Sequence, residues 1–76
     1  MDEQQWRPKD RQQTSWIFGI WNNDQDYLVE WLAAVQRQPS GRWRWNTAGY
    51  GGEEPSREHA KKAAETNVAF AKHIDR

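Results

Sequence analysis

The chain contains no cysteine, which excludes a disulfide framework and any thiolate metal site. It also has no apolar stretch close to the ~20 residues that a membrane-spanning helix needs. Residues 1–13 are polar and mixed in charge, without the apolar segment of a secretory signal. We therefore expect a cytoplasmic protein with no membrane association.

The chain also has no net charge. Eleven Lys and Arg residues balance eleven Asp and Glu residues over 76 positions. A neutral chain creates no overall field that would attract DNA or acidic lipid, so nucleic-acid binding would depend on a local basic patch. The length allows a single domain.

Tryptophan is abundant instead. The chain is 36% hydrophobic and contains six indoles, namely Trp6, Trp16, Trp21, Trp31, Trp43 and Trp45. Each indole can bury ~150–250 Å². In so short a chain, we expect these rings to supply much of the core and any remaining ones to form an adhesive surface.

The sequence offers little to a metal ion. His59 and His73 are fourteen residues apart, which is ~21 Å along one helix. Residues 22–26 have an Asn and two Asp at calcium-loop spacing, but Tyr27 and Ala33 stand where such a loop needs Gly and Glu. We expect a polar turn there, and no cofactor.

A catalytic set is not apparent either. Three serines fall at predicted structural positions, a strand start, a turn and a helix cap: Ser15, Ser40 and Ser56. The glycine-rich residues 49–52 lack the Lys-Ser or Lys-Thr of a phosphate-binding loop, and Glu53 and Glu54 directly after them would repel phosphate. The sequence therefore indicates a protein that is not an enzyme.

The N-terminal third predicts an arm, a strand and a turn. We expect residues 1–13 to be a flexible polar arm, because Trp6 is the main side chain in it that could pack. Aromatic and β-branched residues predict a strand over about residues 15–21. The Asn and Asp residues of 22–26 favour a turn. Residues 14–76 would form one small α+β domain.

Residues 27–37 fit two patterns. A period of 3.6 gives a helical stripe of Leu28, Trp31, Leu32 and Val35. A period of two gives a strand whose apolar face holds Tyr27, Val29, Trp31, Ala33 and Val35, with Leu28, Glu30, Leu32, Ala34 and Gln36 on the other face.

The following turn favours the strand. Residues 39–41, Pro-Ser-Gly, suit a three-residue hairpin loop, a type I turn followed by a left-handed glycine. With that loop, Val35 faces Trp45 and Ala33 faces Thr47, so the indole lands on the apolar side. We therefore predict strands over about residues 27–37 and 42–48.

The rest of the chain predicts a loop and a helix. Residues 48–55 are rich in glycine, and Ser56 is a suitable N-cap after Pro55. The helix would span about residues 56–74, with an alanine-rich stripe of Ala60, Ala63, Ala64, Asn67, Val68, Ala71 and Ile74. The predicted fold is a three-stranded antiparallel meander packed against one C-terminal helix.

One helix covers one face of such a sheet, which leaves the other face to solvent or to a partner. Arginine and tryptophan are enriched at the residues that dominate protein interfaces. We expect a protein partner to contact this face at Trp21, Leu32, Arg42 and Arg44. The alternatives are that the N-terminal arm folds over the face or that a monomer forms a weak homodimer there.

Residues 27–74 also resemble a family in pattern. A Trp-bearing strand, a Gly-containing turn, a second strand and a Ser-capped Ala-rich helix look like the DNA-binding domains of plant ethylene-response factors. The arm-binding N-terminal domains of tyrosine integrases are similar. The resemblance implies a sheet that reads DNA, with the roles falling to Arg42, Arg44 and Asn46. Arg37 joins the candidate DNA-binding residues because it clusters with Arg42 and Arg44 at the hairpin tip.

The leading hypothesis is a non-enzymatic binding module that docks on a protein. Its small size and lack of a catalytic set are typical of bacterial or phage accessory and regulatory proteins. DNA binding through the arginine-rich hairpin is the alternative, because electrical neutrality and the adjacent Glu53 and Glu54 weaken phosphate attraction.

Overall fold

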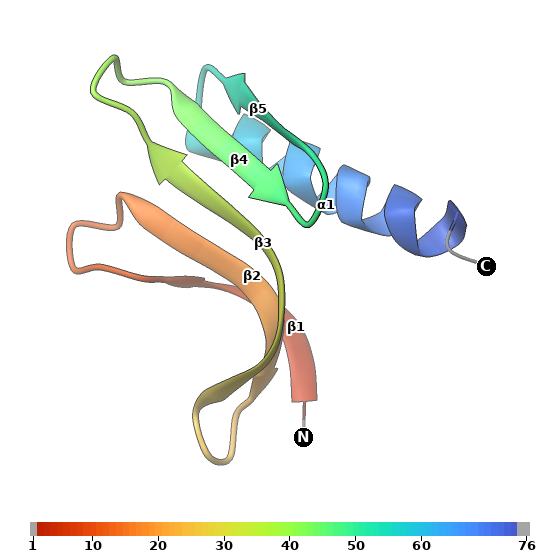
Figure 1. Ribbon diagram of the computed structural model, residues 1–76. Helices are drawn as coiled ribbons and strands as arrows, with labels where there is room; N and C mark the ends of the chain where they lie inside the picture. Colours follow the sequence, from red (N-terminus) through yellow and green to blue (C-terminus); the bar gives the residue numbers. More distant parts are fainter. Residues whose placement is uncertain (1, 75–76) are drawn as a thin grey trace.

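The computed structural model describes residues 2–74, with side chains as far as Phe70. It is an antiparallel sheet with one C-terminal helix on one face (Figure 1). The elements are β1 (Asp2–Pro8), β2 (Ser15–Asn22), β3 (Tyr27–Arg37), β4 (Trp43–Thr47), β5 (Gly51–Glu54) and α1 (Arg57–Ile74). Strand order follows chain order. The predicted α+β class is confirmed, but the described sheet has five strands where three were expected.

The expectation of a free N-terminal arm is wrong, because β1 pairs with β2 along its whole length. Trp6 stacks on Phe18 with ring centroids 4.9 Å apart. Its indole N–H also donates to the carboxylate of Glu65 on α1, at 2.5 Å. Trp6 thus links this polar segment to β2 through an aromatic partner and to α1 through a polar one.

The predicted β3–β4 hairpin is confirmed. Val35 pairs with Trp45 and Ala33 with Thr47. The Gly41 N–H donates to the Gln38 carbonyl at 2.9 Å, and Gly41 has a φ of 91°, where an L side chain is strained. The turn therefore fixes the strand register.

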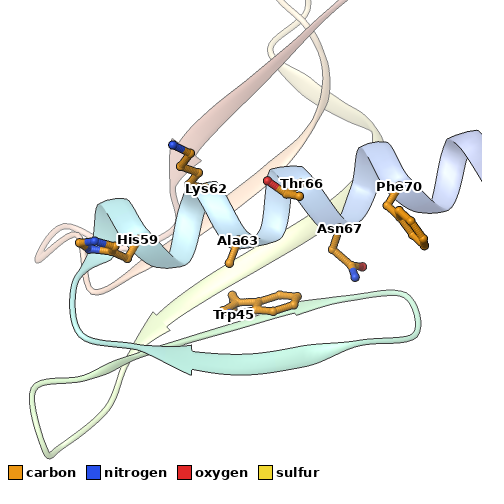
Figure 2. Close-up of a pocket in the computed structure, with 7 residues that line it drawn as sticks. All are labelled: Trp45, His59, Lys62, Ala63, Thr66, Asn67 and Phe70. Carbon is orange, nitrogen blue, oxygen red and sulfur yellow. The ribbon is translucent and has the colours of Figure 1, made fainter.

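The expectation of a plain loop over residues 48–55 is wrong in its second half. Gly51–Glu54 forms β5 and pairs with β4, with Gly52 opposite Trp45. Figure 2 shows the Trp45 ring lying between this hairpin and Ala63 of α1. Glycine permits this strand because the indole occupies the space where a side chain would stand.

A bulged register between β2 and β3 changes the predicted faces. Phe18 pairs with Ala33, but the next residue, Gly19, pairs with Trp31, so Leu32 is an extra residue. Leu32 packs against the buried core, whereas Trp31 lies on the opposite face and is 38% exposed. The predicted alternation, with Trp31 inside and Leu32 outside, is therefore wrong at these two positions.

The helix begins where predicted. The Ser56 Oγ accepts a hydrogen bond from the His59 N–H at 3.2 Å, which caps the first turn. Ala60 and Ala64 of the predicted stripe are fully buried, and Val68 packs against the core. The side chains of Ala71, His73 and Ile74 lie outside the described residues.

Within the described part of the chain, no helix has the length and apolar composition needed to cross a membrane. The helix crosses β3, β4 and β5 on one side of the sheet (Figure 1). No element among residues 2–74 covers the opposite side of the sheet, which is termed the open face.

Candidate functional site on the open face

The centre of the open face is a shallow hollow around Trp31. Its volume is about 200 Å³, and Ile17 and Ala34 line it beside the indole. These two residues are cross-strand partners on β2 and β3. Polar groups also line the hollow, contributed by Lys9, Ser15, Gln36, Arg44 and Asn46. The hollow therefore combines one aromatic ring and small apolar groups with polar and charged side chains.

The bulge at Gly19 exposes the indole of Trp31. A Cβ on Gly19 would lie 2.5 Å from the Glu30 carbonyl oxygen and 2.5 Å from a Leu28 methyl carbon. Only glycine therefore allows β3 to approach β2 this closely. The extra residue of this bulge, Leu32, shifts the alternation of β3 so that the Trp31 side chain lies on the open face.

The arginine end of the face is neutralised in part. Arg44 lies directly opposite Glu53 on β5, with a nitrogen–oxygen distance of 3.5 Å. Arg42 contacts the other oxygen of the same carboxylate at 3.4 Å. Both guanidinium groups are exposed, but they share one acidic partner and leave one net positive charge in this trio.

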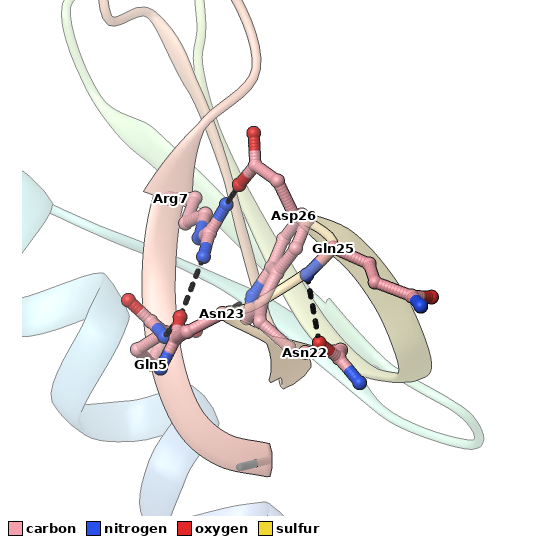
Figure 3. Close-up of polar contacts among 7 residues, drawn as sticks. Gln5, Arg7, Asn22, Asn23, Gln25 and Asp26 are labelled. Atoms are coloured by element: carbon pink, nitrogen blue, oxygen red, sulfur yellow. Dashed lines mark hydrogen bonds and ion pairs between the residues drawn. The ribbon is translucent and has the colours of Figure 1, made fainter.

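The other end of the face is built around Trp21. The Arg7 guanidinium lies 4.6 Å from the centroid of its ring, and the indole N–H donates to the Gln5 carbonyl at 3.1 Å. Figure 3 shows Arg7 reaching from β1 to the β2–β3 turn, where it bonds Asn23 and Asp26. Trp21 is therefore partly covered by β1.

The predicted polar turn after β2 is confirmed. The Asp26 N–H donates to the Asn22 carbonyl at 2.7 Å, and the Gln25 N–H donates to the Asn22 side-chain oxygen at 2.9 Å. The Asp26 carboxylate forms an ion pair with Arg7. Among the described residues, no three His, Asp or Glu side chains form a group that could hold a metal ion.

The predicted contact residues are divided between the two faces. Four of them lie on the open face: Trp21, Arg42, Arg44 and Asn46. Leu32 lies against the core on the helix side. Arg37 pairs with Trp43, whose side chain points away from the face of Arg44, so it does not join the other arginines. The predicted place of Leu32 on the open face is therefore wrong, whereas the predicted pairing of Arg37 with Trp43 is confirmed.

Sequence reasoning missed Trp31 as the central open-face residue. The available signal was the isolated glycine at position 19 inside an otherwise apolar strand, which is typical of a bulge. Lys9 was missed too, because no pairing of residues 1–13 with the sheet was foreseen.

The site offers an indole, aliphatic groups, amides and cations within one shallow surface. Comparison of the chain with protein-family models, curated proteins and solved structures finds no match.

Proposed function

We propose that this chain is a non-enzymatic accessory or regulatory module that docks on a protein partner through its open face. The observation that carries the proposal is the exposed indole of Trp31 at the centre of that face, over Ile17 and Ala34. A large aromatic ring inside a polar rim is the arrangement that dominates many protein interfaces. Arg44 and Trp21 extend the contact toward the two ends of the sheet.

The charge pattern favours a protein over a nucleic acid. Phosphate-driven affinity grows with the number of unpaired cations that release counterions. On the hairpin, Arg42 and Arg44 share Glu53, and Arg37 lies on the other face. A mixed cluster of this kind suits the complementary charges of a protein rim.

The test begins with immobilised wild-type protein and a lysate of its source cells. Bound proteins would be identified by mass spectrometry, and their affinities then measured with purified components. Trp31→Ala should weaken the interaction at least ~10-fold, in keeping with truncation of an interface anchor. Tyr50→Ala is the matched control, because Tyr50 is 65% exposed on the β4–β5 turn. A partner that binds Trp31→Ala as tightly as wild type contradicts the proposal.

Nucleic acid is the competing outcome. Random-sequence duplex and single-stranded DNA would be titrated with the protein between roughly 50 and 200 mM salt. We expect no binding at the lower salt concentration. Binding that weakens steeply with salt, with a smaller slope for Arg44→Gln, would replace the protein partner with DNA held by Arg42, Arg44 and Asn46.

A further inference from the structure

A second hollow lies on the helix side of the sheet, between α1 and β4. It is a groove of about 400 Å³ with Trp45 as its floor and Ala63 and Phe70 on its helix wall (Figure 2). Lys62 and Thr66 line its outer rim. The groove is separate from the open face, because Trp45 and Trp31 lie on opposite sides of the sheet.

An exposed phenyl ring stands at one end of this groove. Phe70 is 60% exposed, although its neighbour on the preceding turn, Asn67, is tied to β4 by a hydrogen bond from the Thr47 hydroxyl at 2.8 Å. The helix is therefore held against the sheet up to Asn67, and Phe70 follows where cover by the sheet ends. A protruding apolar ring thus lies beside an apolar groove.

The chain exposes more surface than a compact monomer of its mass, which is the condition for an interface with a second copy. Its accessible area is 5441 Å². A folded monomer of 9.0 kDa is expected to expose about 4,850 Å². The difference is on the order of 600 Å², which is close to the ~800 Å² that each partner loses in a standard-size interface.

We propose that a second copy of this chain occupies the groove, with the two α1 helices antiparallel. Ala63, Thr66 and Phe70 are spaced three and four residues apart, so they form one stripe along the helix. A twofold axis between Thr66 and Asn67 puts the Phe70 ring of each copy over Ala63 of the other, beside Trp45. The protruding ring of Phe70 and the space over Ala63 then lie on the same stripe, as an isologous interface requires.

Size and charge are compatible with this pairing. Ala63 has the smallest side chain on the stripe, so it leaves the groove open for a phenyl ring that lies beside Trp45. At the axis, Thr66 and Asn67 are neutral. The two copies of Lys62 would be separated by about nine residues of helix, or ~13.5 Å along the axis, so their repulsion is screened at physiological salt.

Analytical ultracentrifugation of the full chain between about 5 and 500 µM tests the proposal, because association must depend on concentration. We expect a monomer–dimer equilibrium whose dissociation constant rises at least ~10-fold in Phe70→Ser. Trp31→Ala on the open face should leave the dimer unchanged. Wild type that stays monomeric over the range, or Phe70→Ser that dimerises like wild type, overturns the proposal.

A single engineered cysteine tests the geometry, since the chain has none of its own. Thr66→Cys places two thiols at the proposed axis, so oxidation should yield a disulfide-linked dimer. Ser40→Cys, in the β3–β4 turn, is the control and should stay monomeric. Equal crosslinking of the two variants would contradict the antiparallel helix pair. Circular dichroism checks that each variant is folded. Dimerisation through the groove does not depend on the open face, so failure of the Trp31→Ala experiment would leave the crosslinking result unaffected.

Discussion

The indole of Trp45 lies on Gly52, its cross-strand partner on β5. A Cβ at Gly52 would be 3.0 Å from the indole nitrogen and 3.2 Å from two ring carbons. Gly52→Ala should therefore lower the free energy of unfolding by about 1–3 kcal/mol, the usual cost of overpacking. Urea denaturation followed by tryptophan fluorescence measures it.

Gly49→Ala is the control for that experiment. Among the described residues, no atom lies within 4 Å of a Cβ added at Gly49. Its stability should change by less than about 1 kcal/mol, since the backbone there needs no left-handed conformation. If both alanine variants unfold at the same urea concentration, Trp45 does not lie as close to Gly52 as the structure indicates.

Trp6→Ala tests whether β1 contributes to stability. The substitution removes the stack on Phe18 and the hydrogen bond to Glu65. We expect the free energy of unfolding to fall by about 2–4 kcal/mol, somewhat less than for a fully buried aromatic ring. Gln12→Ala, in the exposed β1–β2 turn, should change it by less than ~0.5 kcal/mol. A near-zero effect of Trp6→Ala would restore the picture of a free arm.

The elements that could be predicted from sequence are those set by local chemistry. A single left-handed glycine, Gly41, closes the β3–β4 turn and so fixes which residues of β3 and β4 face each other. A single hydroxyl, that of Ser56, caps the helix. These signals depend on one or two residues and their immediate neighbours, so no knowledge of the tertiary structure is needed to read them.

The elements that could not be predicted depend on contacts across the fold. The residues of β1 and β5 are mainly Gln, Glu, Asp and Gly, which have low strand propensity. Trp6 and Trp45 hold those strands through partners on other elements. The same holds for the candidate site, since the bulge opposite Gly19 decides that Trp31 is exposed and Leu32 is not.

The hydrogen bonds of Asp10 predict that the free energy of unfolding depends on pH in the acid range. The Thr14 hydroxyl, helped by the Thr14 and Ser15 backbone N–H groups, holds the pKa of Asp10 below its usual value near 3.8. A lowered folded pKa stabilises the fold above about pH 4, and that stabilisation is lost as the pH falls through the folded value.

Asp10→Asn should therefore be less stable than wild type at neutral pH, and the difference should shrink as the pH is lowered below about 4. Thr14→Val, which removes the hydroxyl, should reduce the same pH dependence. Thermal unfolding at several pH values between about 2.5 and 7 measures both. A difference between wild type and Asp10→Asn that stays constant over this range would contradict the assigned hydrogen bonds.

Lys61 connects the helix to the β1–β2 side of the sheet through aromatic faces. Its ammonium nitrogen lies 3.7 Å from the centroid of the Trp16 ring and 5.4 Å from that of Trp6. Burial, together with the nearby Arg57 charge, lowers the pKa of Lys61. The negative faces of the two rings attract its ammonium group. We therefore expect a favourable coupling between Lys61 and Trp16 of about 0.5–2 kcal/mol.

A double-mutant cycle at neutral pH measures that coupling. It combines Lys61→Met, which keeps most of the aliphatic packing, with Trp16→Leu, and each unfolding free energy comes from urea denaturation. The neighbouring lysine gives the matched control, because Lys62 is exposed and lines the groove on the β4 side of the helix. The cycle of Lys62→Met with Trp16→Leu should be additive within ~0.5 kcal/mol. Equal coupling in both cycles would mean that the Lys61 contact with the indole contributes nothing of its own.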